Sequence, residues 1–260
     1  MKYDIGELLD NWLFDPDEFI ARRITARDGS EKIQIRIDMG MLQLELEGRP
    51  DGQRPYGSMS LLEHYNKRVA QGTSGNDVSL GEEACEELFQ EAWQYYQRYL
   101  SLFYLEDYTG VIDDSEHNVE IFELVSQHAD SDEIKWYFEQ YYPHAIMMQT
   151  RAKAMLALEK QDYRSALHEV ELGMDRIEGF LAEWDGEALE EDLPELSFLQ
   201  DWFQELEKQR PLSQKEQLER DLNVAVETEN FEEAARLRDK LRTMRPFLKG
   251  PSTGHRSSLT

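Results

Sequence analysis

Residues 211–246 read PLSQKEQLERDLNVAVETENFEEAARLRDKLRTMRP, and this stretch predicts two short helices between two prolines. Ser213 with Glu216, and Asn230 with Glu233, have the spacing of capping boxes. In a capping box, a short polar side chain and a carboxylate satisfy the free N–H groups that begin a helix. We therefore expect helices to start near residues 213 and 230. The terminal prolines limit the pair, because proline breaks a helix interior.

The apolar residues of both predicted helices recur at helical spacing. On the first helix, one face carries Leu218, Leu222 and Ala225. On the second, one face carries Phe231, Ala234, either Leu237 or Arg238, and Leu241. The neighbouring alanines at 234 and 235 make the second helix thin there, so the first can approach closely. The pattern predicts an antiparallel αα-hairpin with a tight turn at residues 228–230.

The same residues resemble the UVR motif of the bacterial excision-repair proteins UvrB and UvrC, which also occurs in the ClpC chaperone and McsA-type regulators. The most specific part is NFEEAARLRD, residues 230–239. In that family the hairpin docks onto a similar hairpin of its partner, so the resemblance implies a protein partner, either another UVR-type hairpin or a second copy. The predicted partner-binding residues are Leu218, Leu222, Ala225, Phe231, Ala234, Ala235, Arg238 and Leu241. The alternative interpretation is a generic alanine-rich hairpin that closes a helical stack.

The charge of the chain is strongly and unevenly negative. The 260 residues carry a net charge of −26, and the hydrophobic fraction of 40% is sufficient for a sizeable core. Residues 61–210 hold 34 acidic and 11 basic residues, whereas residues 236–260 hold seven basic residues and one acidic residue. The acidic part argues against nucleic-acid or membrane binding. The basic C-terminal end supports the alternative of a nucleic-acid-associated repair accessory factor.

The cysteine content and the N-terminus favour a cytoplasmic protein. Cys85 is the single cysteine, so no internal disulfide can form. Its acidic neighbours raise a thiol pKa, so we expect an inert, half-buried residue. The N-terminal sequence MKYDIGELLDNW lacks the pattern of a signal peptide, and no apolar run has the length of a membrane span.

Residues 1–57 are predicted to contain a three-stranded antiparallel β-meander packed on helices. Ile33, Ile35 and Ile37 alternate with polar residues, as do the leucines at 42, 44 and 46. A turn at Met39-Gly40 would place Ile37 opposite Leu42 and the remaining apolar residues in matching pairs. A second turn at Asp28-Gly29 would place Ile24 opposite Ile33. The fold class is therefore mainly α with a small N-terminal sheet.

Residues 58–210 are predicted to form an acidic domain of stacked helical hairpins. The aromatic residues at 89, 93, 96 and 103 share a stripe with Leu100, which predicts that most of them are core and that Tyr95 and Tyr99 lie off it. Asp113 or Asp114 is expected to cap a helix. Residues 151–181 resemble a tetratricopeptide hairpin, although no full repeat period is present. Residues 211–246 then form the UVR-like hairpin, and residues 247–260 a disordered tail.

No motif of catalysis or metal binding is evident. The six histidines lack the i, i+4 spacing of a zinc helix, and no phosphate-binding loop is present. Arg49 and Arg54 lie in a glycine-containing loop, which is either a structural connection or a ligand site. We expect a non-enzymatic interaction or adaptor protein with no cofactor and no metal. A third hypothesis is an enzyme or small-molecule sensor that uses the sheet and the Arg49–Tyr56 loop.

Overall fold

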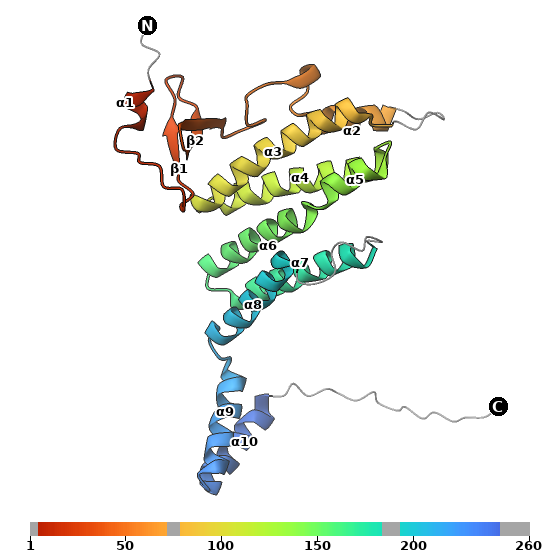
Figure 1. Ribbon diagram of the computed structural model, residues 1–260. Helices are drawn as coiled ribbons and strands as arrows, with labels where there is room; N and C mark the ends of the chain where they lie inside the picture. Colours follow the sequence, from red (N-terminus) through yellow and green to blue (C-terminus); the bar gives the residue numbers. More distant parts are fainter. Residues whose placement is uncertain (1–4, 72–78, 184–192, 245–260) are drawn as a thin grey trace, which may run out of the picture. The chain divides into compact units, whose positions relative to one another are not determined.

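The computed structural model describes residues 5–71, 79–183 and 193–244, and the predicted tail at 247–260 lies outside them. The chain is mainly helical with a small antiparallel sheet near the N-terminus, as predicted (Figure 1). It folds as two compact units, Met1–Lys208, called the body, and Gln209–Thr260. Among the helices of the described residues, none has both the length and the apolar character required to cross a membrane.

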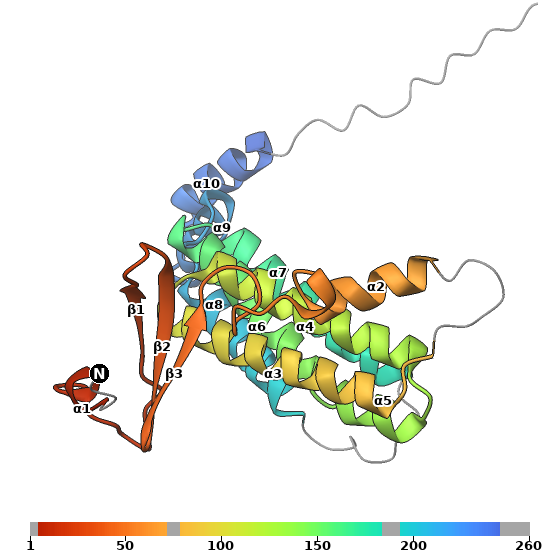
Figure 2. The same ribbon diagram turned by 90° about the horizontal axis from the view of Figure 1, so that it is seen from above.

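The sheet of the body contains three strands in the order β1 (Ala21–Thr25), β2 (Glu31–Ile37) and β3 (Gly40–Glu45). Ile33, Ile35 and Leu44 are buried in the same core as the helices that follow. The short helix α1 (Gly6–Leu9) lies on the other side of the sheet from those helices (Figure 2). The meander is therefore packed on helices, because its apolar face must be covered.

The predicted register between β2 and β3 is wrong by two residues. Ile37 pairs with Gly40 and Ile35 pairs with Leu42, so the turn lies at Asp38-Met39. A shift of two residues leaves the same side chains on the inner face, so the apolar pattern does not distinguish the two registers. The observed register pairs Lys32 with Glu45, which form an ion pair, and it also joins the side chains of Gln34 and Gln43. These polar cross-strand pairs favour the observed alignment.

The predicted register between β1 and β2 is wrong by one residue. Thr25 pairs with Glu31, and Ile24 lies opposite Lys32, not opposite Ile33. The loop has three residues, because Gly29 N–H donates to Ala26 O at 3.0 Å and Gly29 has a left-handed φ of 87°. A turn followed by a left-handed residue is the usual three-residue hairpin loop, and its extra residue places Ile24 on the opposite face from Ile33.

The helices of the body form stacked antiparallel layers. A 3-10 turn, η1 (Pro55–Gly57), precedes them, and their bounds are α2 Leu61–Gln71, α3 Glu82–Tyr104, α4 Tyr108–His128, α5 Asp132–Glu139, α6 Tyr142–Glu159, α7 Tyr163–Glu183 and α8 Pro194–Gln209. Helices α3, α4, α6 and α7 pack in that order, each against the next (Figure 1). The predicted hairpin at 151–181 falls within α6 and α7. Its likeness to a tetratricopeptide repeat stays a prediction.

Two predicted features of the helices are wrong. Asp107, not Asp113 or Asp114, caps α4, and its carboxylate accepts from Gly110 N–H at 3.3 Å. Asp114 lies inside α4, where both of its oxygens accept from Arg98 at 2.7 Å. On α3, Tyr95 and Tyr99 are buried, whereas Trp93 is 53% exposed. The buried face of α3 lies beside the predicted aromatic stripe and runs through Cys85, Leu88, Ala92, Tyr95, Tyr99 and Leu102.

A fully buried carboxylate joins several elements of the body. Glu91 on α3 is 0% exposed. Its carboxylate accepts from the N–H groups of Leu61 and Leu62, the first residues of α2, at 2.8 and 3.1 Å. Its oxygens also lie 3.1 Å from Arg49 Nε and 3.1 Å from His117 Nε2 on α4. Buried charges require such partners, so Glu91 connects the loop after β3, α2 and α4 to α3.

Three helix–helix turns share one backbone geometry. Each has a non-glycine residue with left-handed φ, at Glu106 (60°), Gln161 (57°) and Glu229 (55°). In the second turn, Gln161 N–H donates to Leu158 O and Asp162 N–H donates to Ala157 O, at 2.8 and 3.0 Å. These paired bonds satisfy the last carbonyl groups of the first helix. The following Asp or Asn then accepts from the next helix, so one helix ends and another begins within three residues.

Candidate functional site

The C-terminal hairpin consists of α9 (Gln214–Glu227), the turn at 228–230 and α10 (Phe231–Met244). Ser213 and Glu216 form the predicted capping box. Ser213 Oγ accepts from Glu216 N–H at 3.2 Å, and Ser213 N–H donates to Glu216 Oε2 at 2.8 Å. Arg210, which the sequence interpretation did not identify, donates to both oxygens of Glu216 at 2.6 and 3.0 Å. Together these bonds lower the pKa of Glu216 to about 2, the Arg210 hydrogen bonds being the largest cause.

The inner face of the hairpin is small. Ala225, Ala234 and Leu237 are its buried residues, and Leu218 and Leu222 pack against them in part. Of the two residues that the sequence left as alternatives for the inner face, Leu237 and Arg238, the structure buries Leu237. The alanine at 234 brings α10 close to Ala225 of α9, as its small size predicts.

The outer face of α10 carries three predicted partner-binding residues. Phe231, Ala235 and Arg238 follow the i, i+4, i+7 spacing of one helix face, and all three are exposed. Phe231 is 68% exposed, a large fraction for an aromatic side chain. The eight predicted residues therefore divide into two groups, one inside the hairpin (Ala225 and Ala234, with Leu218, Leu222 and Leu241 partly buried) and one facing outward. Their role in partner binding stays a prediction.

Apolar exposure also extends around the turn. Val224 and Val226 are each about half exposed, and both lie within four residues of the turn that precedes Phe231. The residues of this end of the hairpin thus expose three large apolar side chains close together in sequence.

In the loop with Arg49 and Arg54, the charge of Arg49 is already paired. The Arg49 guanidinium lies 3.1 Å from Glu91 and 3.5 Å from Asp51, and only a tenth of its side chain is exposed. Arg54 is exposed. The arrangement shows a structural connection at Arg49, because Glu91 and Asp51 already balance its charge.

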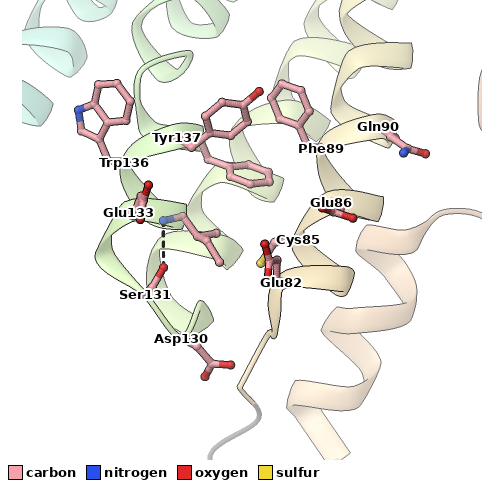
Figure 3. A pocket seen from close by; sticks show the side chains of 12 residues that line it. Glu82, Cys85, Glu86, Phe89, Gln90, Asp130, Ser131, Glu133, Trp136 and Tyr137 are labelled. Atoms are coloured by element: carbon pink, nitrogen blue, oxygen red, sulfur yellow. Dashed lines mark hydrogen bonds between the residues drawn. The ribbon is translucent and has the colours of Figure 1, made fainter.

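A wide acidic groove lies between α3 and the segment that contains α5 (Figure 3). Its volume is about 950 Å³. Glu82, Cys85, Glu86 and Phe89 of α3 face residues 130–138, which include Asp130, Glu133, Trp136 and Tyr137. Phe89 and Tyr137 have ring centroids 4.8 Å apart.

The groove has no activated nucleophile at Cys85. Burial, and secondarily the charge of Asp130, raises the pKa of the Cys85 thiol to about 11. The thiol is buried, which is deeper than the half-buried position expected, and its proton is retained at neutral pH. In the described residues, no group of three or more His, Cys, Asp or Glu side chains has an arrangement that could hold a metal ion.

Comparison with known proteins identifies a family motif in the hairpin and none in the body. Residues 213–245 match the family model described as the UvrB/uvrC motif, so the chain carries a UVR motif at the position that the sequence predicted. In UvrB and UvrC this motif is a protein–protein interaction module. A search of curated proteins and a search of solved structures gave no match.

Proposed function

We propose that this protein is a non-enzymatic cytoplasmic adaptor, which binds a protein partner through the outer face of α10. The observation that supports the proposal most strongly is the exposure of Phe231 within a UVR motif. An aromatic side chain at the centre of an interface commonly contributes a large share of binding free energy. Ala235 is one turn further along the same face, and its small side chain leaves room for a second helix next to Phe231.

The small inner core of the hairpin supports the same proposal. Chains shorter than about 40 residues rarely bury enough apolar surface to fold alone and usually require a metal, disulfides or association. The described part of this hairpin has three buried residues and contains neither a cysteine nor a metal-binding group. Association with a similar hairpin through the outer face of α10 would bury Phe231 and add to this small apolar surface. The partner is therefore proposed to be a second UVR-type hairpin, from another protein or from a second copy.

Arginines lie at the rim of the proposed interface, beside the acidic Glu232 and Asp239. Arg238 lies on the face of Phe231, and Arg236 and Arg242 lie on the same helix. Charged residues at the rim of an interface steer association and choose among partners more than they add affinity. A partner hairpin with acidic residues at its rim would fit this surface.

The proposal is tested by affinity capture with the full chain. Phe231→Asp is compared with Met39→Asp, a matched control because Met39 is 90% exposed at the β2–β3 turn of the body. We expect the wild type and Met39→Asp to recover the same partner and Phe231→Asp to bind it at least about tenfold more weakly. Equal recovery by Phe231→Asp, or recovery of no partner by any form, contradicts the proposal.

A further inference from the structure

An aromatic cavity of about 330 Å³ lies in the body, where α3, α4, the α5–α6 segment and α8 meet. None of its described lining residues belongs to the C-terminal hairpin, and the proposed function does not use it. Six aromatic rings contribute to its lining: Phe89, Trp93, Tyr96, Tyr99, Phe122 and Tyr141. Several of these rings contact one another, with Trp93 and Tyr96 stacked at 5.0 Å and Phe89 and Tyr141 at 5.8 Å between centroids. The size is within the range of small-molecule sites.

Two polar atoms of the lining residues are buried without a hydrogen-bond partner. One is Oδ1 of Asn118, a residue that is 2% exposed and that donates its Nδ2–H to Ala92 O at 2.9 Å. The other is Nε2 of His144. Buried polar atoms are nearly always paired in folded proteins, so two unpaired ones at a single cavity call for an explanation. A bound ligand that forms hydrogen bonds with both atoms would explain why neither has a partner in the protein.

Both unpaired atoms can accept a hydrogen bond. Oδ1 of Asn118 is a carbonyl oxygen, which only accepts. Nδ1 of His144 lies 3.7 Å from the carboxylate of Glu195, which favours a proton on Nδ1, and the tautomer protonated there accepts at Nε2. The proximity of His144 also lowers the pKa of Glu195, so this carboxylate is negatively charged near neutral pH.

The remaining groups of the cavity have the same electrostatic preference. Aromatic faces attract cations, and Glu195 adds a negative charge at the cavity. Among the described residues that line it, neither lysine nor arginine occurs. Acceptors, ring faces and a carboxylate together favour a cation that carries N–H donors. A planar guanidinium fits best, because it stacks on rings and donates in its own plane.

We propose that this cavity binds a guanidinium group, from a small molecule or from an arginine side chain of another protein. The ring faces would contact the plane of the cation, and Asn118 Oδ1 and His144 Nε2 would accept from its N–H groups. Glu195 would balance its charge.

Calorimetric titration of the full chain with three probes tests each part of the proposal. Butylguanidinium has the charge and the donors, N-butylurea has a similar shape without the charge, and tetramethylammonium has the charge without N–H groups. We expect butylguanidinium to bind at least about tenfold more tightly than either of the others, since one desolvated cation–ring or charge-assisted contact has this magnitude. Equal binding of N-butylurea or of tetramethylammonium overturns the proposal. Binding of none of the three also overturns it, since buried water would then be the partner of the two acceptors.

Variants locate the binding within the cavity. Glu195→Gln should weaken butylguanidinium binding by roughly fivefold, whereas Glu133→Gln, which removes an equal charge from the acidic groove, should leave it unchanged. Trp93→Leu removes a ring that is already half exposed and should also weaken binding, with the fold checked by circular dichroism. Equal affinity in both glutamine variants places the cation elsewhere and contradicts the assignment.

A short peptide separates the two sources of the guanidinium. If acetyl-Gly-Arg-Gly-amide binds as tightly as butylguanidinium, the cavity accepts an arginine side chain of a protein. If only butylguanidinium binds, the ligand is a small molecule. Either result supports the guanidinium site.

Discussion

Glu229 and Gln161 have the same left-handed backbone conformation at equivalent positions of two helix–helix turns, with φ of 55° and 57°. Each N–H donates three residues back, to Val226 O in one turn and to Leu158 O in the other. A side chain at such a position is strained, because its Cβ crowds the neighbouring carbonyl oxygen. The chain accepts this strain at both turns in order to reverse direction in few residues.

Glycine at these two positions should stabilise the protein. We expect Glu229→Gly and Gln161→Gly each to raise the free energy of unfolding of its own unit by about 0.5–1 kcal/mol, the relief of strain less the extra backbone entropy of glycine. Urea unfolding followed by circular dichroism measures the effect. Glu219→Gly, inside α9 and exposed, is the matched control and should destabilise by a similar amount. Destabilisation by both turn variants would show that the left-handed residues are not strained.

The contact between α6 and α7 depends on Gly173. A Cβ atom at this residue would lie 2.1 Å from Oγ1 of Thr150, which is buried on α6. Gly173→Ala should therefore lower the free energy of unfolding by about 1–3 kcal/mol through overpacking. Gly179 lies on the same helix with open space around its added Cβ, so Gly179→Ala should be neutral or stabilising.

Thr150→Ala provides the complementary test. It removes Oγ1 and Cγ2, the two atoms nearest to the added methyl group, although Cβ of residue 150 remains at 2.8 Å. The double variant should recover part of the stability that Gly173→Ala loses. An unchanged loss in the double variant would place the strain at another contact.

Acid should destabilise the N-terminal turn of α9 in the wild type, but not in the Glu216→Gln variant. The pKa of Glu216 is about 2 in the folded protein, against 4.5 for the unperturbed residue. Its contribution to stability is therefore complete above pH 4.5 and is lost as the pH falls toward 2. NMR shifts of residues 213–217 should change across this window in the wild type. Glu216→Gln cannot ionise at this position, so identical titration curves in the two proteins would contradict the assignment.

Cys85 should resist alkylation in the folded protein. Burial raises the pKa of its thiol to about 11, so the thiolate fraction is very small at pH 7.5. We expect iodoacetamide to modify Cys85 rapidly in urea and at least about a hundredfold more slowly in buffer, because the reactive form is both rare and enclosed. Mass spectrometry over time measures the two rates. Comparable rates would show that the N-terminal part of α3 opens readily.

Local chemistry made the C-terminal hairpin predictable. Ser213 and Glu216 form the expected capping box, and Asn230 accepts from Glu233 N–H at the start of α10. Short-range signals of this kind act within one turn of helix and do not depend on the rest of the fold. The sequence did not show that Phe231 faces outward, since residues 231 and 234 are both apolar and were expected on one face. In the structure Phe231 is exposed on the same face as Ala235, and Ala234 is buried.

The choice of buried faces in the body depended on longer-range packing. Both the stripe through Phe89 and the stripe through Leu88 have helical spacing, and the packing of α3 against α4 and the sheet buries the second. The sheet register was ambiguous for a related reason, because a two-residue slip preserves the inner face. The aromatic cavity was not predictable, since Asn118, His144 and Glu195 come from three separate segments whose sequence carries no shared motif.

The ion pair of Glu91 also limits where the protein can be truncated. Its partner Arg49 belongs to residues 1–57, so a shortened protein that begins at residue 58 would enclose an anion deprived of its arginine. Removing one member of a buried ion pair costs about 3–5 kcal/mol, a large part of the stability of an ordinary domain. The sheet and the helices therefore depend on each other for stability, and an expression fragment of the body has to retain both.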